Sequence, residues 1–176
     1  MVKSIRSKFW KALTLNEDFY NNIPDNAAHR QFSLSIVLLA ALSYSIGSVV
    51  ILGMNREPLV ILALGFGISI SLIIGSYYFW TFTVDKLLRW ATFQSLSYRE
   101  LLNLIGFAYA PQLFALFTLI PLLGRPIELL LNAWSLFAVI AALRHKLNIK
   151  LTKAFLVCFP GWLLSNVGIG AIQVLQ

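Results

Sequence analysis

The sequence has few charged residues and a single cysteine. Asp, Glu, Lys and Arg make up 12% of its 176 residues and apolar residues make up 59%, whereas soluble domains are typically about 25% charged and about 45–50% apolar. A soluble fold of this size could not bury so much apolar surface, so the composition indicates a membrane protein. The one cysteine, Cys158, excludes an internal disulfide and a cysteine cluster. We expect it to be a small buried apolar group.

Ionisable residues are nearly missing from the long apolar tracts. Acids and histidines at membrane depth usually mark proton relays, ion paths or catalytic groups, and Glu128, at the margin of one tract, is the only candidate. His29 and His145 flank the tracts, and two isolated histidines do not form a recognisable metal site. The chain also lacks a Gly-rich phosphate loop, an HExxH motif and a GxSxG motif. The sequence therefore predicts no enzymatic activity, no cofactor and no bound metal.

Five tracts without Asp, Glu, Lys or Arg define the expected fold. A helix needs roughly 17–25 mainly apolar residues to cross ~30 Å of hydrocarbon, and four of the tracts reach this length. The fourth tract along the chain is shorter, and it reaches this length if its helix starts at Pro126. That start is favoured because Pro is common at the first helical position and Glu128 would meet the positive end of the helix dipole. A re-entrant or surface helix is the alternative there. We predict an all-α fold, a polytopic transmembrane bundle of about five spanning helices, at residues 32–54, 58–83, 101–123, 126–143 and 154–174.

The chain is expected to have two parts. Residues 31–176 form the membrane domain, and residues 1–30 form a cytoplasmic segment with an amphipathic helix followed by a polar connector. The helix, over residues 1–14, places Val2, Ile5 and Phe9 on one face and would lie in the membrane interface. Because this segment lacks acids and contains Arg and Ser, an organelle transit peptide is the alternative.

Lys and Arg are unevenly distributed around the expected spans. Of the 14 basic residues, all but Arg56 and Arg125 flank the spans on the side of the N-terminus. Because basic residues are retained in the cytoplasm, we expect the N-terminus inside and the C-terminus, after an odd number of crossings, on the opposite side.

The basic segments next to the spans are expected to bind membrane lipids, including anionic headgroups. They are short, and no motif or stacking platform accompanies them, so nucleic-acid binding is not expected. The residues predicted to face the lipid are Lys3, Arg6, Lys8, Lys11, Arg144, Lys146, Lys150 and Lys153.

Uncharged polar residues within the spans have two interpretations. They can form hydrogen bonds between helices, each contributing ~0.6 kcal/mol, or they can line a narrow polar cavity. We interpret them as hydrogen-bonding groups between helices and keep the cavity as the alternative. The residues are Tyr44, Asn103, Tyr109, Gln112, Thr118, Asn132, Asn166 and Gln173.

Small residues and prolines indicate how the helices pack. Gly106 and Ala110 are one of several pairs of small residues at four-residue spacing, which lets neighbouring helices approach closely. Pro111 and Pro160 each remove an amide donor and free the carbonyl four residues earlier, so we expect kinks in the third and fifth spans.

The segment from residue 97 to 154 contains an ordered set of Gly, Pro, aromatic and Ser residues within and after the third span and in the fourth. They are Gly106, Tyr109, Pro111, Pro121, Gly124, Trp134 and Ser135. In the order of these residues, the segment resembles the core of the Yip (Ypt-interacting protein) domain family, especially its prokaryotic members.

This resemblance implies five spans and a cytoplasmic N-terminus. Eukaryotic members reside in the Golgi and endoplasmic reticulum and bind small prenylated GTPases of the Rab type. The present sequence lacks the Asp-Leu-Tyr-Gly-Pro signature, the long N-terminal region and the Gly-Tyr pair of those members, since Phe107 follows Gly106. It fits a bacterial member better, so the expected location is a bacterial inner membrane or an internal, thylakoid-like membrane rather than a eukaryotic organelle.

Three functional hypotheses follow from the sequence. The first is a non-enzymatic scaffold, assembly or membrane-organisation factor, which acts through helix packing and a basic cytoplasmic face that engages lipids or a membrane-protein partner. The alternative is a small-molecule or ion permease lined by the uncharged polar residues. The second alternative is an accessory subunit of a larger membrane complex.

Overall fold

The computed structural model describes residues 27–92, 96–120 and 122–174, and every regular element in these ranges is a helix. The predicted all-α fold is therefore confirmed. The elements are α3 (Ala27–Met54), α4 (Leu59–Thr92), α5 (Tyr98–Ala108), the 3₁₀ helix η1 (Ala110–Leu119), α6 (Gly124–Leu147) and α7 (Leu151–Val174). The predicted interfacial helix over residues 1–14 lies outside the described residues.

The long helices agree with a polytopic bundle of about five spans. Within the described residues, four helical stretches are long and apolar enough to cross a membrane: His29–Met54, Leu59–Ala91, Tyr98–Leu119 and Gly124–Leu147. The fifth long helix, α7, has 24 residues and so a length of about 36 Å at 1.5 Å per residue. The helix for the fourth expected span, α6, is also continuous over 24 residues. Which end of the bundle faces the cytoplasm stays a prediction.

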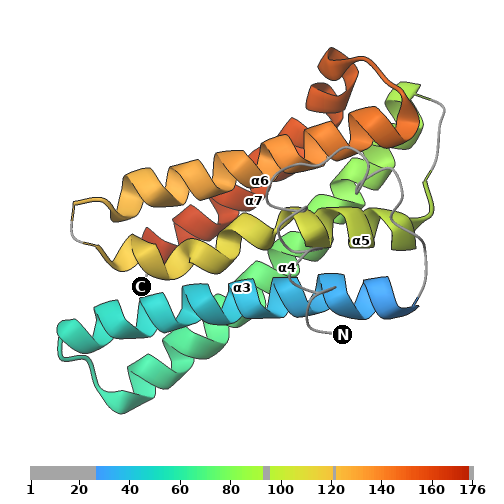
Figure 1. Ribbon diagram of the computed structural model, residues 1–176. Helices are drawn as coiled ribbons and strands as arrows, with labels where there is room; N and C mark the ends of the chain where they lie inside the picture. Colours follow the sequence, from blue (N-terminus) through green and yellow to red (C-terminus); the bar gives the residue numbers. More distant parts are fainter. Residues whose placement is uncertain (1–26, 93–95, 121, 175–176) are drawn as a thin grey trace.

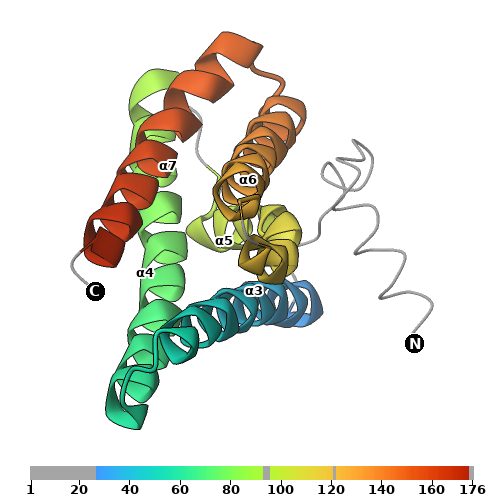
Figure 2. The ribbon, with the colours of Figure 1, turned by 90° about the vertical axis from the view of Figure 1, so that its left-hand side faces the viewer.

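The helices pack as an antiparallel bundle (Figures 1 and 2). A tight turn with Arg56 in the left-handed conformation, at φ 58°, joins α3 to α4. The helix α3 packs against α4, α5 and η1, while α7 packs against α4 and α6. The start of α3, the end of α4, the start of α5, the end of α6 and the start of α7 therefore lie at one end of the bundle (Figure 1).

The helix α4 continues to Thr92, beyond the expected end of the second span at residue 83. Val84 and Leu88 lie one turn apart on it and are fully buried, so packing holds the extra turns against the bundle. Asp85 lies one helical turn before Arg89, and its Oδ1 pairs with Arg89 Nε at 3.0 Å. The expected span and the turns beyond residue 83 thus form one continuous helix.

The third span changes helix type near Pro111. The α-helix α5 ends at Ala108, and the ten residues after Tyr109, Ala110–Leu119, form η1, although 3₁₀ segments longer than about four residues are uncommon. The Ser43 side chain on α3 donates to the carbonyl of Leu113 at 3.0 Å and accepts from the amide of Leu116 at 3.2 Å. The kink expected at Pro111 therefore takes the form of a 3₁₀ segment held by α3. Pro160, in contrast, lies inside the continuous helix α7.

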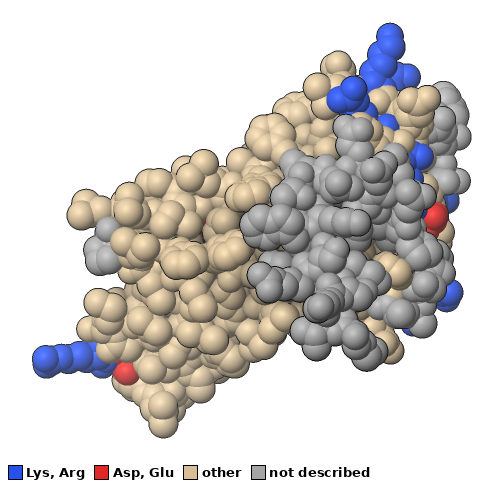
Figure 3. Space-filling view, viewed as in Figure 1, with Lys and Arg blue, Asp and Glu red and all other residues tan. Residues whose placement is uncertain are grey.

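The apolar core lies around α5. Seven of the eleven residues of this helix are buried, and its fully buried Leu101, Ile105 and Phe107 belong to the same cluster as Val139 of α6 and Val157 of α7. The outer faces are apolar too, and Leu59 is 81% exposed. Figure 3 shows the uncharged surface between charged groups at the two ends of the molecule. Such a belt suits contact with lipid, because hydrocarbon solvates exposed apolar side chains.

Candidate functional site

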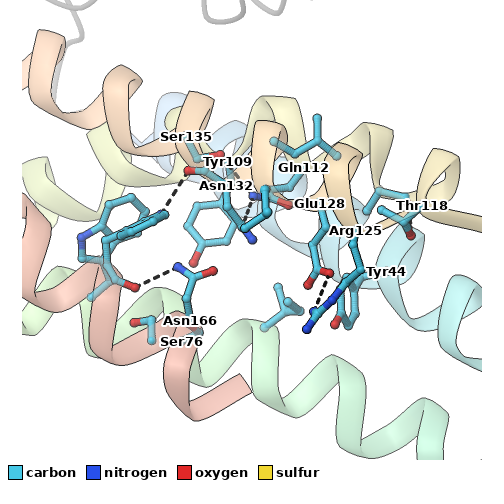
Figure 4. Close-up of a pocket in the computed structure, with 17 residues that line it drawn as sticks. Tyr44, Ser76, Tyr109, Gln112, Thr118, Arg125, Glu128, Asn132, Ser135 and Asn166 are labelled. Carbon is cyan, nitrogen blue, oxygen red and sulfur yellow. Dashed lines mark hydrogen bonds and ion pairs between the residues drawn. The ribbon is translucent and has the colours of Figure 1, made fainter. Parts of the chain in front are cut away.

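A cavity of about 200 Å³ with polar lining residues lies between the helices, next to the apolar core (Figure 4). Its lining residues come from α3, α4, the segment from Tyr109 through η1, α6 and α7. Six of the eight uncharged polar residues singled out in the sequence lie there: Tyr44, Tyr109, Gln112, Thr118, Asn132 and Asn166.

The remaining two of those residues do not line it as far as the structure describes them. Asn103 is buried between α5 and α3, where its Oδ1 accepts a hydrogen bond from the Ser33 hydroxyl at 3.2 Å. The side chain of Gln173 lies outside the described residues.

Hydrogen bonds between helices frame the cavity. Gln112 Nε2, on η1, donates to Asn132 Oδ1 at 2.8 Å and to Ser135 Oγ at 3.4 Å, and both acceptors are on α6 (Figure 4). The interpretation as hydrogen-bonding groups is therefore confirmed for Gln112 and Asn132. The cavity kept as an alternative is also present, because side chains on η1, α6 and α7 converge without filling the space between them.

The α7 side of the cavity combines aromatic and polar groups. Trp162 Nε1 donates to the backbone carbonyl of Asn132 at 3.0 Å, which ties α7 to α6. Asn166 Nδ2 donates to the carbonyl of Trp162 at 2.8 Å, one turn earlier on its own helix. Ser165 also lines the cavity, and its buried hydroxyl has no hydrogen-bond partner among the described residues.

Aromatic side chains close the cavity toward the apolar core. The Tyr109 ring lies 5.7 Å from that of Tyr77 and 6.1 Å from that of Trp80, measured between centroids. Trp80 Nε1 donates to the carbonyl of Cys158 at 3.0 Å, which fixes the position of its ring. Tyr109 and Trp80 thus belong both to the apolar core cluster and to the cavity wall.

An ion pair lies at the opposite side of the cavity. Arg125 Nη1 and Glu128 Oε2 are 3.2 Å apart, and the side chain of Glu128 is only 23% exposed whereas that of Arg125 is 82% exposed. Together with Tyr44 and Thr118, both residues also line a second cavity of about 430 Å³. This outer cavity reaches Asn55, in the turn after α3. The inner cavity therefore adjoins the bundle end that carries Arg56 and Arg125.

The other end of the bundle is basic. Eight Lys and Arg residues among the described ones lie near the helix termini at that end, against two acids, Asp85 and Glu100. Asp85 pairs with Arg89, and Glu100 pairs with Lys146 at 3.3 Å. The remaining basic residues at this end are Arg30, Lys86, Arg99, Arg144, Lys150 and Lys153.

A comparison with protein families identifies the fold. The family model described as the Yip1 domain matches residues 10–172, which is nearly the whole chain. The chain belongs to the Yip1 domain family. The resemblance seen in the sequence is thereby confirmed, and with it a multi-pass membrane protein. No curated protein and no solved structure matches the chain.

Two of the Yip1-domain residues that carry the resemblance are packing glycines. A Cβ atom at Gly106 would lie 2.9 Å from Ser33 Cβ on α3, and one at Gly124 would overlap the carbonyl oxygen of Thr118. Real Cβ contacts of this kind essentially do not occur, so only glycine allows these close approaches.

The other Yip1-domain residues have different surroundings. Tyr109 and Ser135 line the cavity, Pro111 lies at the start of η1, and Trp134 is 42% exposed on α6. Pro121 lies outside the described residues. The family pattern thus includes two cavity residues, and their functional role stays a prediction.

The predicted lipid-facing residues are only partly described. Lys3, Arg6, Lys8 and Lys11 lie outside the described residues, while Arg144, Lys150 and Lys153 are exposed at the basic end. The Lys146 side chain is only 14% exposed because it turns toward Glu100. Three of the four described residues are thus exposed, and their contact with lipid headgroups stays a prediction.

Sequence reasoning missed part of the cavity lining. Ser76, Ser135 and Ser165 are small residues, and small residues in spans are typical of helix packing. The sequence indicates Arg125 as a basic flank of the spans and Glu128 as a residue at the margin of a span, and neither as a cavity residue. The sequence signal for the cavity was a polar residue at a similar depth on each of four helices, α3, η1, α6 and α7. Depth alone does not show which faces of these helices contact one another.

Proposed function

We propose that this Yip1 domain protein is a non-enzymatic membrane-organisation protein that holds anionic lipids and a membrane-protein partner at its basic end. The uneven charge of the two bundle ends is the observation that supports this proposal. Eight described basic residues and two acids lie at one end, and Arg56, Arg125, Glu57 and Glu128 lie at the other.

The backbone brings basic residues from different helices together. Asn148 caps α6 in the left-handed conformation, at φ 50°, and α7 begins three residues later. Arg144, Lys150 and Lys153 therefore surround one short turn, and all three are exposed. A basic residue next to an anionic membrane surface contributes ~1 kcal/mol to the attraction, so this group can retain a headgroup.

Lipid retention can be tested by native mass spectrometry of the purified protein incubated with phosphatidylglycerol or phosphatidylcholine. We expect the triple variant Arg144→Gln, Lys150→Gln, Lys153→Gln to lose at least about tenfold in phosphatidylglycerol affinity, since each residue contributes ~1 kcal/mol. The control Arg56→Gln removes an exposed charge at the other end and should bind as the wild type does. Equal loss in both variants, or equal binding of the two lipids, contradicts the proposal.

The partner can be tested by native electrophoresis and mass spectrometry of membranes solubilised in mild detergent. The proposal expects one membrane protein to migrate with the wild-type chain and with Arg56→Gln, but not with the triple variant. Migration of the wild-type chain by itself contradicts the scaffold role without affecting the lipid result.

The cavity favours a second candidate function, a small-molecule permease. It is the arrangement expected of a polar site at membrane depth, since binding sites in helical bundles lie between the helices. Flux of glycerol into liposomes containing the purified protein tests this function. We expect Gln112→Leu and Asn132→Leu to abolish the flux, and flux equal to that of protein-free liposomes contradicts the candidate.

A further inference from the structure

We infer that the inner cavity is a binding site for a small neutral molecule that carries several hydroxyl or amide groups. The inference deepens the second candidate function by naming the ligand class, but it concerns binding and does not need passage across the membrane.

The cavity interior offers hydrogen bonds without net charge. Gln112, Asn132 and Asn166 carry amides, which both donate and accept, and serines from α4, α6 and α7 supply hydroxyls that do the same. The two charged lining residues, Arg125 and Glu128, pair with each other. A charged ligand would have to enter low-dielectric surroundings without an unpaired counter-charge, which is costly.

Several polar atoms in the cavity have bonding capacity beyond the contacts between helices. The Gln112–Asn132 bond uses Gln112 Nε2 and Asn132 Oδ1, which leaves Gln112 Oε1 and Asn132 Nδ2 outside that bond. Ser165 Oγ is buried and has no partner among the described residues. Because burying a polar group without a hydrogen bond is costly, a ligand that bonds Ser165 Oγ is favoured.

The walls and the size limit the ligand further. Ile73, Leu131, Trp80 and Trp162 supply apolar surface around the polar groups. The volume of about 200 Å³ corresponds to about six or seven water molecules at ~30 Å³ each. A molecule with a similar number of non-hydrogen atoms, an apolar carbon chain and hydroxyls along one edge matches both properties, as glycerol does.

Access is expected from the end opposite the basic one. The outer cavity adjoins the inner one through Tyr44, Thr118, Arg125 and Glu128. On another side, Tyr109 and Trp80 of the apolar core cluster line the inner cavity. A neutral solute can pass the paired Arg125 and Glu128 without separating charges from their partners.

Thiol labelling tests the inference in full-length protein in detergent, in a Cys158→Ala background. Ser165→Cys places a thiol in the cavity, and Ser45→Cys places one at a fully buried serine that does not line it. The probe is methyl methanethiosulfonate, which is small and neutral. We expect the thiol of Ser165→Cys to react at least about tenfold faster than that of Ser45→Cys, since reactivity requires access.

Protection then tests the ligand class. Saturating glycerol should slow the labelling of Ser165→Cys at least about fivefold, because a site occupied most of the time blocks the reagent. Glycerol 3-phosphate and 1-propanol, which match glycerol in carbon number but carry charge or only one hydroxyl, should not protect. Should Ser165→Cys fail to fold, Ser135→Cys provides the same test from α6.

Three outcomes overturn the inference. They are equal labelling rates of Ser165→Cys and Ser45→Cys, labelling of Ser165→Cys that glycerol does not slow, and protection by glycerol 3-phosphate or 1-propanol equal to that by glycerol. Glycerol protection without glycerol flux would support the binding site and contradict the permease function. Failure of the binding inference and failure of the permease function are therefore distinguishable.

Discussion

The hydroxyl of Ser43 on α3 accepts a hydrogen bond from the backbone amide of Leu116 on η1 at 3.2 Å. The same hydroxyl donates to the carbonyl of Leu113 at 3.0 Å. A single side chain thus bonds both a donor and an acceptor of the 3₁₀ segment that carries Gln112 into the cavity. Such bonds matter at membrane depth because no water replaces them.

Replacing Ser43 should therefore destabilise η1. We expect Ser43→Ala to lower the free energy of unfolding by about 1–2 kcal/mol, since it removes two hydrogen bonds and leaves backbone groups unpaired. Thermal unfolding in detergent measures the effect. The control is Ser35→Ala, because Ser35 is an exposed serine of the same helix that donates to the carbonyl of Gln31. Equal unfolding temperatures of the two variants would show that Ser43 does not hold the segment.

The close contact of α5 with α3 predicts a strong effect at Gly106. Gly106→Ala should destabilise the protein by about 1–3 kcal/mol, because the new Cβ would overlap Ser33 in a packed interface. Gly67→Ala, on α4, meets no atom within 4 Å and should be neutral or stabilising by up to about 1 kcal/mol, since Ala favours helices over Gly. Unfolding in denaturant measures both variants. A decrease in the free energy of unfolding as large in Gly67→Ala as in Gly106→Ala would contradict the packing explanation.

The proposed access route predicts that the outer cavity can be plugged. Gly47 lines this cavity, and a Cβ at Gly47 meets no atom within 4 Å, so Gly47→Phe should fit and fill the space. We expect it to slow methanethiosulfonate labelling of Ser165→Cys at least about tenfold, because reaction requires access to the thiol.

Gly67→Phe is the matched control for the plug, since Gly67 has equal space for a side chain but lies in a separate groove on α4. It should leave the labelling rate unchanged. Undiminished labelling in Gly47→Phe would place the access route elsewhere.

The charge distribution predicts the orientation in the membrane. A reporter fused after Gln176 should be found outside the cytoplasm, because basic flanks stay inside and five crossings put the two termini on opposite sides. A reporter fused before Met1 should be inside and serves as the control. Finding both reporters inside would contradict an odd number of crossings.

Much of the fold could be predicted because each spanning helix must satisfy its own backbone. In hydrocarbon an unpaired amide or carbonyl has no water to bond, so long uncharged tracts form helices whatever their neighbours are. The positions where the helices end were less predictable. The helix α4 continues past Val84 because Val84 and Leu88 are buried against other helices, which depends on packing rather than on hydropathy.

The helical membrane domain and the basic flanks were determined by the sequence alone, since hydropathy and charge are properties of each segment by itself. The polar cavity was decided by the tertiary structure. Tyr44, Gln112, Asn132 and Asn166 lie far apart in the chain and converge only when α3, η1, α6 and α7 pack. Helical periodicity places a side chain on one face of its own helix, but which faces meet depends on how all the helices pack at once.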